Sequence, residues 1–342
     1  MNELLNVLYV QTQGTVLHLD HDTVRVELEG ETRLRAPLIR LSGIVVFGRV
    51  TVTPFLIQRC AEDGRSLVWL TTTGRFTARV EGETRGNVLL RRAQHLALSE
   101  PERPRDIARQ FVAAKIQNSR NLLLRGARET TDTGQHETLA SAAVRLAGSL
   151  EQLRSSGGLD EIRGVEGDAA RTYFDGFWGM VRAGDDFKVQ GRSRRPPRDR
   201  VNAVLSFLYA LVRGECAAAL EGVGLDPQVG YLHALRPGRP ALALDLMEEL
   251  RPVLADRLAL TLLNRHQLQV GHFEEFPGGA VHLNDEGRRV VLTAYQQRKT
   301  EEVQHRVLKQ KVALGLVPHV QARLLARYLR RDIPDYPPFL YR

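Results

Sequence analysis

The spacing of apolar residues changes near residue 88 and divides the chain into two parts. Before that point, apolar and polar residues alternate at 23–28, and short runs rich in β-branched and aromatic residues occupy 44–47 and 67–70. Alternation predicts half-buried strands, whereas the short runs predict strands buried on both faces. Glycines separate these segments at intervals typical of turns. We therefore expect residues 1–78 to form a β-sandwich domain.

After an expected linker at 79–90, apolar residues recur at the three- and four-residue spacing of amphipathic helices. Few strand patterns occur in residues 91–342, which are expected to form a larger all-α domain with a loop at 130–134. The predicted fold class is α+β, with the β-sandwich first. The predicted helices lie at 107–118, 201–212, 242–263 and 317–331.

The composition is that of a globular chain with an excess of positive charge. Of 342 residues, 43% are apolar, and the net charge is +8. This charge favours a polyanionic partner, because each Lys or Arg that neutralises a phosphate releases counterions. A membrane surface is the competing explanation, but the basic clusters lie beside loops and polar helices. No uninterrupted apolar run reaches membrane-spanning length, so we expect no membrane partner.

The two cysteines, Cys60 and Cys216, lie far apart and form no CxxC pair. Neither a structural zinc site nor a disulfide framework is therefore predicted. The first ten residues include Glu3 and lack a basic region, a long apolar stretch and a cleavage site, so no signal peptide is predicted. We expect a reduced, cytoplasmic protein.

Two segments of the helical part carry carboxylates in positions suited to a cation. Glu166 lies between glycines near an expected helix start at Ala169, where the small neighbours leave room for an ion or a phosphate. On spacing alone, capping of that helix by Glu166 or Asp168 is the better explanation. Asp245 and Glu248 share one face of an expected helix, where two carboxylates repel each other unless a cation lies between them.

His233 precedes a tight Arg-Pro-Gly-Arg-Pro turn and lies close in sequence to the acidic pair. A lone His is more often a structural or surface residue than a ligand. A Glu, a His and an acidic pair, however, offer hard oxygen ligands and one imidazole, which suit Mg²⁺ or Mn²⁺. The sequence contains no nucleophile elbow, P-loop or dinucleotide-binding motif. This agrees with a reaction in which a metal activates water or a DNA 3′-hydroxyl.

Three basic clusters lie in the helical part, at 188–200, 288–311 and 323–331. Basic runs are usually solvated faces, but three of them beside candidate metal ligands favour contacts with a phosphate backbone. The aromatic segment 173–178 is expected in the core rather than stacked on bases. The candidate DNA-binding residues are Lys188, Arg192, Arg194, Arg195, Arg239, Arg323 and Arg327.

Together these motifs resemble the CRISPR-associated spacer integrase, the universal adaptation protein of CRISPR systems, and most of all its subtype I-C branch. The resemblance spans nearly the whole chain. It implies a dimerising N-terminal β-sandwich, a helical catalytic domain, and two homodimers bridged by a small companion adaptation protein into a heterohexamer. The segments that carry it are 86–92, 114–120, 163–167, 194–202, 230–233, 245–252, 321–327 and 336–340.

The resemblance also implies the roles of four site residues and a reaction. Glu166, His233 and Glu248 match the metal-binding positions of the family, and Asp245 matches a further acidic position beside the metal. The implied antiviral reaction is attack by the 3′-hydroxyl of a captured DNA fragment on a phosphodiester at the edge of a CRISPR repeat. With water as nucleophile, the same site is an endonuclease. His233 either binds the metal or helps a proton reach the leaving oxygen.

Two alternatives remain open at this point. A metal-dependent nuclease that acts on branched DNA in repair would share the site but would need neither a repeat nor a companion protein. A non-catalytic nucleic-acid scaffold would use the basic surfaces and would bind no metal.

Overall fold

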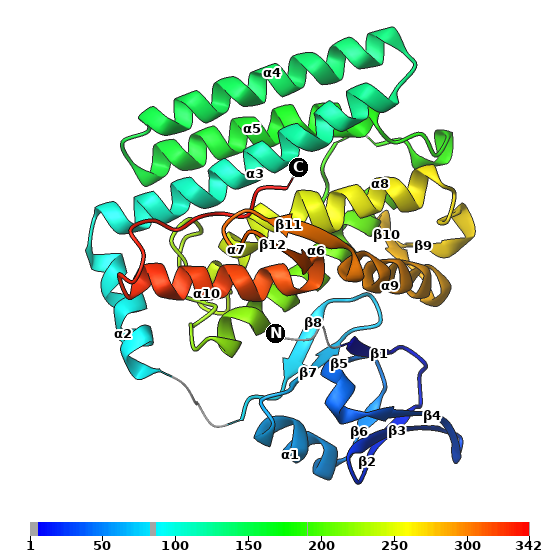
Figure 1. Cartoon of the computed structure of the whole chain (residues 1–342). Coiled ribbons are helices and arrows are strands. Elements are labelled where there is room, and N and C mark those ends of the chain that lie inside the picture. Colours follow the sequence, from blue (N-terminus) through cyan, green and yellow to red (C-terminus); the bar gives the residue numbers. More distant parts are fainter. Residues whose placement is uncertain (1–5, 83–86, 190, 342) are drawn as a thin grey trace.

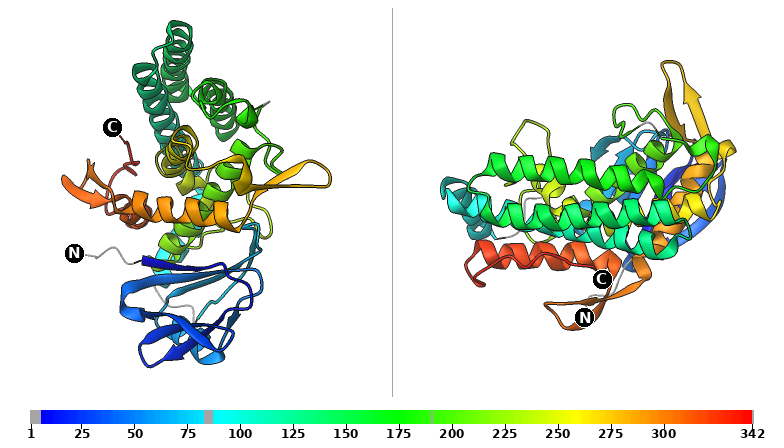
Figure 2. Two further views of the ribbon diagram at one scale, coloured as in Figure 1. Left: turned by 90° about the vertical axis from the view of Figure 1, so that its right-hand side faces the viewer. Right: turned by 90° about the horizontal axis from the view of Figure 1, so that it is seen from above.

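The structure is a computed structural model that describes residues 6–82, 87–189 and 191–341. Figure 1 shows a sheet-rich N-terminal domain beneath a helical domain, and Figure 2 shows the same two parts from two further sides. This is the α+β arrangement that the sequence predicted.

The N-terminal domain contains two four-stranded sheets among the described residues. The first sheet has the order β1 (Asn6–Val10), β5 (Leu41–Phe47), β7 (Ser66–Leu70) and β8 (Phe76–Arg79). The second has the order β4 (Glu31–Pro37), β3 (Thr23–Leu28), β2 (Val16–Asp20) and β6 (Thr51–Val52). Strands β1, β5 and β7 are parallel, and β2, β3 and β4 are antiparallel. The strands predicted at 23–28, 44–47 and 67–70 are confirmed.

The two sheets share one hydrophobic core. Leu17 and Val24 from the second sheet, and Ile44 and Leu67 from the first, are fully buried in the same cluster. In β3, the alternate residues Val24 and Val26 enter this core, which is the arrangement that the alternating sequence pattern predicts.

Helix α1 (Pro54–Glu62) interrupts the strands, although we expected only strands up to residue 75. Pro54 occupies the first helical turn, where its missing N–H costs nothing. Leu56 and Cys60 lie one turn apart and are buried, so the segment follows a helical period that its short length concealed.

The helical domain begins after β8, and α2 starts at Val88, inside the linker expected at 79–90. Its helices are α2 (Val88–Leu96), α3 (Glu102–Glu129), α4 (Thr133–Ser155), α5 (Leu159–Gly179), α6 (Arg200–Gly222), α7 (Ala241–Arg251), α8 (Arg257–Asn264), α9 (Asp285–Thr300) and α10 (Val317–Leu329). The four predicted helices lie in α3, in α6, in the run from α7 to α8, and in α10. A π-helical turn at Pro252–Asp256 joins α7 to α8.

Two short hairpins within the described residues were not predicted, since we expected an all-α domain after residue 91. Strands β9 (Phe273–Phe276) and β10 (Ala280–Leu283) form the first, and β11 (Glu302–His305) and β12 (Gln310–Ala313) form the second. Both project from the helices (Figure 2), and each strand has only four residues. Alternation over so few residues gives a weak pattern.

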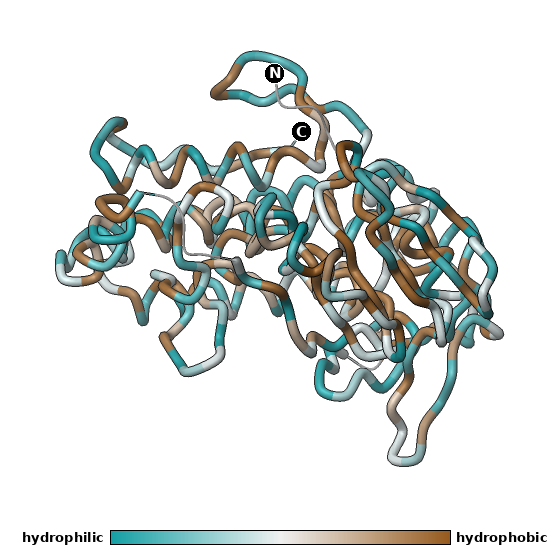
Figure 3. Tube along the Cα trace, turned by 90° about the horizontal axis from the view of Figure 1, so that it is seen from below, coloured by the Kyte–Doolittle hydropathy of each residue, from teal (hydrophilic) through white to brown (hydrophobic). Residues whose placement is uncertain are grey.

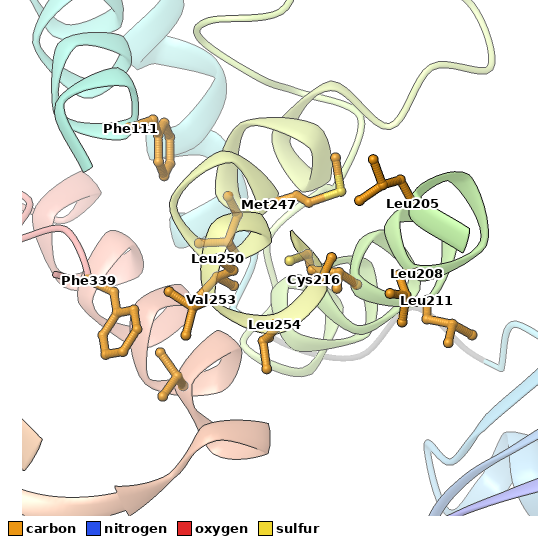
Figure 4. Close-up of a cluster of buried hydrophobic side chains, with 14 of the residues drawn as sticks. Phe111, Leu205, Leu208, Leu211, Cys216, Met247, Leu250, Val253, Leu254 and Phe339 are labelled. Carbon is orange, nitrogen blue, oxygen red and sulfur yellow. The ribbon is translucent and has the colours of Figure 1, made fainter. Parts of the chain in front are cut away.

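Helices α3, α4 and α5 lie side by side in a layer on the far side from the N-terminal domain (Figures 1 and 2). Helices α6 and α7 lie beneath this layer, and Figure 4 shows Leu205 of α6 close to Met247 of α7 within the buried cluster. The hydrophobic segments gather inside the sheets and the central helices, whereas most peripheral loops are hydrophilic (Figure 3).

Helix α6 is long and apolar enough to cross a membrane by composition alone. However, 56% of its apolar window is buried in the protein, as in the central helix of a packed domain. Phe207 on α6 stacks on Phe47 of β5 with ring centroids 6.2 Å apart. Helix α6 therefore packs among the helices of its own domain and contacts the N-terminal domain through Phe207.

Candidate metal and DNA-processing site

Asp245 is fully buried on α7 and holds the segment that precedes this helix. Its carboxylate accepts hydrogen bonds from the backbone N–H groups of Tyr231 at 2.6 Å, Leu232 at 3.0 Å and His233 at 2.9 Å. Three such donors stabilise a buried carboxylate without a metal. The repulsion that we expected between Asp245 and Glu248 is therefore relieved at Asp245 by hydrogen bonds, and not by a shared cation.

Gly230 permits this close approach of the loop to α7. A Cβ atom at position 230 would lie 2.6 Å from the Ala241 carbonyl carbon and 2.7 Å from Asp245 Oδ2. Because backbone atoms cannot yield as a side chain can, only glycine fits here.

The same carboxylate orients the imidazole of His233. The Nδ1 atom of His233 lies 2.7 Å from Asp245 Oδ1, and its Nε2 atom lies 4.0 Å from Glu248 Oε1. A carboxylate partner favours a proton on Nδ1, which leaves the lone pair on Nε2 free for a ligand. Asp245 is thus a positioning residue that directs His233 towards Glu248.

Glu248 is buried between two cations. The ammonium of Lys115, from α3, lies 2.7 Å from Glu248 Oε2, and Arg251 Nη1 lies 3.3 Å from the same oxygen. Burial alone raises the pKa of Glu248, but the positive charges of Arg251 and Lys115 outweigh it and lower that pKa to about 2. The carboxylate therefore stays ionised despite its burial.

Glu166 is the partly exposed member of the cluster and binds the same ammonium of Lys115. We expected a helix start near Ala169, with capping by Glu166 or Asp168 as the better explanation on spacing alone. That expectation is wrong, because α5 begins at Leu159 and Glu166 lies in its interior. The neighbouring glycines, 164 and 167, do not end the helix, since neither adopts the positive φ with which a glycine terminates a helix.

The donor set has ligand types that suit a divalent cation. Within the described ranges, no three His, Cys, Asp or Glu side chains are placed to hold an ion as they stand. The reason is local: Glu166 and Glu248 meet through the ammonium of Lys115. Two carboxylates that already share one cation, with an imidazole Nε2 beside them, are the ligand types that Mg²⁺ and Mn²⁺ accept.

The π-helical turn at Pro252–Asp256 contacts this cluster through Tyr209 and Arg251. Asp256, at the end of the turn, is fully buried and accepts hydrogen bonds from Tyr173 at 2.8 Å and Tyr209 at 2.6 Å. The guanidinium of Arg251 lies 5.1 Å from the centroid of the Tyr209 ring, within cation–π range. Arg251 is thus fixed by aromatic contact as well as by Glu248.

Arg192, a candidate DNA-binding residue, belongs to the same supporting network. Its guanidinium lies 5.3 Å from the centroid of the Tyr209 ring and donates to Asn202 Oδ1 at 2.6 Å. Burial lowers the pKa of Arg192. The structure therefore places the Arg192 side chain against Tyr209 and Asn202 of α6 rather than on the open surface.

The other candidate DNA-binding residues lie in three places. Lys188, Arg194 and Arg195 are exposed in the segment before α6, and Lys188 also pairs with Asp185 at 3.1 Å. Arg239 is half-buried in the turn between His233 and α7. Arg323 and Arg327 are exposed one turn apart on α10, as the helical spacing predicted.

The basic cluster at 288–311 is smaller than the sequence suggested. Lys299 is buried and pairs with Glu215 at 2.5 Å, and Arg298 is buried and donates to the carbonyl of Val253 at 3.2 Å. Arg288 is also buried. These three side chains are buried and are not available to a phosphate backbone. The exposed members of the cluster are Arg289, Arg306, Lys309 and Lys311.

Glu249, the neighbour of Glu248 on α7, is fully buried. It accepts hydrogen bonds from Tyr336 Oη at 2.6 Å and from the backbone N–H of Phe339 at 2.7 Å. Burial raises the pKa of Glu249 to about 7. The residue next to Glu248 therefore anchors the C-terminal segment against α7.

We did not predict a role in the site for two residues of this cluster, Lys115 and Arg251. Lys115 follows Phe111 by four positions on α3 and so lies on the face that apolar residues occupy. A lysine on a buried face needs a counter-ion, and this signal was available. The aromatic residues of 173–178 lie in or against the core, as predicted.

Comparison with known proteins identifies the family. The sequence model of the family described as CRISPR associated protein Cas1 matches residues 8–297. The CRISPR-associated endonuclease Cas1 1 of Moorella thermoacetica is 56% identical over 343 residues, which cover all of both chains. The chain therefore belongs to the Cas1 family of CRISPR-associated proteins.

Solved structures with the same fold include a casposase bound to its integration product, with a TM-score of 0.84 and 22% identity over 99% of this chain and 95% of that chain. A Cas6-RT-Cas1–Cas2 complex gives a TM-score of 0.80 and 22% identity over 96% of this chain and 35% of that chain. Both likenesses concern the fold, and they agree with the predicted α+β class.

Proposed function

We propose that this chain is an endonuclease and strand-transfer enzyme of CRISPR adaptation that inserts captured foreign DNA fragments at the boundary of a repeat. The convergence of Glu166 with Glu248 and the oriented His233 carries the proposal, because Glu166 comes from a segment that lies far from the other two residues in sequence. The printed name of the Moorella relative, an endonuclease, supports it. We also assign the chain to the subtype I-C branch, on the motifs quoted above.

Glu166, His233 and Glu248 would hold Mg²⁺ or Mn²⁺. Such an ion, when bound, stabilises the charge that develops on a phosphodiester during in-line attack. Asp245 keeps the proton of His233 on Nδ1, so that Nε2 faces the reaction site. Arg251 holds the buried carboxylate of Glu248 in place.

The partners that we propose are double-stranded DNA, a second copy of the chain and a small companion adaptation protein that joins two dimers into a heterohexamer. The net charge of +8 supports a DNA partner. A Cas1–Cas2 assembly with the same fold supports the companion. The exposed residues Arg194, Arg195, Arg323 and Arg327 would contact phosphates. We place this assembly in the cytoplasm.

A strand-transfer assay tests the proposed reaction. The substrates are a plasmid with a CRISPR repeat and a short duplex with free 3′-hydroxyls, supplied with the companion protein and with Mn²⁺, Mg²⁺ or a chelator. We expect His233→Ala to abolish joining without loss of DNA binding, whereas His95→Ala, on the exposed surface of α2, leaves joining unchanged. Joining in the chelator, or full activity of His233→Ala, would refute the metal-ligand assignment.

The same assay separates the repair nuclease from the integrase. A branched duplex without a repeat is offered in a parallel reaction. Cleavage of the branched duplex with no joining to the repeat plasmid would favour the repair nuclease. An absence of metal binding by calorimetry, together with no effect of Glu166→Ala beyond stability, would favour the non-catalytic scaffold.

A further inference from the structure

Lys115 occupies an unusual position for a lysine. Its side chain is only 4% exposed, and its ammonium lies between Glu166 and Glu248. A buried ammonium is stable only when carboxylates compensate its charge, and two buried carboxylates are stable together only when a cation lies between them. Lys115, Glu166 and Glu248 therefore form one mutually dependent unit.

We propose that Lys115 is a tethered cation that keeps the two carboxylates paired in the metal-free protein and that an incoming metal ion must displace. This inference rests on the proposed function, because it takes Glu166 and Glu248 as the ligands. It follows from position and charge: the ammonium contacts both carboxylates that the metal would share. One positive charge then competes with another for the same oxygens.

The architecture suits such an exchange. Lysine carries a compact charge on a flexible four-carbon stem, so its ammonium can leave while its backbone stays fixed in α3. Glu166 has a side chain that is 27% exposed, which leaves one side of the unit accessible to an ion. Glu248 keeps Arg251 as a second cation and is never left without compensation.

A displaceable ammonium has two consequences. It offsets the repulsion between the carboxylates of Glu166 and Glu248 before a metal ion binds, which stabilises the fold without metal. It also weakens the affinity for metal, since each ion that binds must first break the contacts of Lys115. Removal of the ammonium should therefore lower stability in a chelator and raise the affinity for Mn²⁺.

The test compares the full-length protein with Lys115→Met, Lys115→Gln and a matched control, Lys299→Met. Lys299 is equally buried and paired with Glu215, but on α9 and outside this unit. Calorimetric titration with Mn²⁺ gives the Kd, and thermal unfolding in chelator and in Mn²⁺ gives the shift in Tm. Neither readout requires DNA or catalytic turnover.

We expect both Lys115 variants to bind Mn²⁺ at least tenfold more tightly than the wild type and to gain more in Tm on addition of Mn²⁺, with Lys299→Met unchanged in Kd. A Lys115 variant that folds only when Mn²⁺ is present supports the inference in the same way. Equal or weaker binding by the Lys115 variants, or the same gain in Lys299→Met, overturns it. So does failure of both Lys115 variants to fold with and without Mn²⁺.

These outcomes keep the inference separate from the proposed function. If the wild type binds Mn²⁺ and the Lys115 variants bind it no better, only the exchange is refuted. If neither the wild type nor any Lys115 variant binds Mn²⁺, the metal-dependent function itself is refuted.

Discussion

Replacement of Asp245 by Asn tests how much the proposed site depends on one buried carboxylate. The two side chains have the same shape, but an amide keeps one acceptor oxygen and turns the other acceptor into a donor. Oδ2 of Asp245 accepts from two backbone N–H groups, and Oδ1 accepts from the N–H and the imidazole of His233. If the amide N–H₂ group takes the place of Oδ2, the N–H groups of Tyr231 and Leu232 lose their acceptor. If it takes the place of Oδ1, the N–H of His233 loses its acceptor and the imidazole must change tautomer.

The magnitude follows from those lost contacts. A buried donor without an acceptor costs about 1–3 kcal/mol, so the loss of one or two acceptors costs roughly 1–6 kcal/mol. We therefore expect Asp245→Asn to lower the free energy of unfolding by about 3 kcal/mol. If the amide N–H₂ group faces His233, the proton moves to Nε2, and Mn²⁺ affinity falls as well.

Urea unfolding followed by circular dichroism measures the first effect, and calorimetric titration with Mn²⁺ measures the second. Asp168→Asn on the exposed face of α5 is the matched control, and we expect it to change stability by less than about 0.5 kcal/mol. A loss below about 1 kcal/mol for Asp245→Asn would contradict the role assigned to its carboxylate.

Three further results are expected. Burial raises the pKa of Asp256, so the folded protein binds the proton of this carboxyl more tightly than the unfolded chain does. The stability that the protonated carboxyl contributes is present below the unfolded pKa of about 4. It is lost as the pH rises through the folded pKa. Asp256→Asn should remove that part of the pH dependence in urea unfolding, and an unchanged profile would contradict it. Tyr336→Phe removes the donor to Glu249 and should cost about 1–2 kcal/mol in the same measurement, whereas no cost would mean that the hydrogen bond contributes nothing. Gly230→Ala should abolish strand transfer and lower Tm, because its Cβ would collide with the backbone of Ala241; wild-type values would show that the loop can move away.

The sequence predicted the elements of the fold better than the contacts between them. The stripe of apolar residues at 201–212 was enough to identify α6, because a long helix repeats its period several times. The same reasoning missed α1 and the β9–β10 hairpin, which are too short to repeat a period. The start of α5 was misplaced, since glycines 164 and 167 resemble helix breakers in the sequence but keep a helical backbone conformation in the structure.

In the candidate site as well, the sequence predicted residues within one segment better than contacts between distant segments. His233, Asp245 and Glu248 lie within sixteen residues, and their helical spacing indicated that they could act together. Their link to Glu166 runs through Lys115 on α3, and no spacing in the sequence connects these three segments. The position of Arg192 was equally hidden, because its contact with Tyr209 exists only after α6 has packed.

The unequal exposure of Glu166 and Glu248 gives the proposed site a closed floor and an open rim. The side chain of Glu248 is 6% exposed and that of Glu166 is 27% exposed, so solvent reaches the cluster from the α5 side. Glu166 would hold an ion at the accessible side of the cluster. Substitutions at Glu166 would then remove a ligand at the rim, whereas substitutions at Glu248 would also leave the buried cations Lys115 and Arg251 without their shared counter-ion.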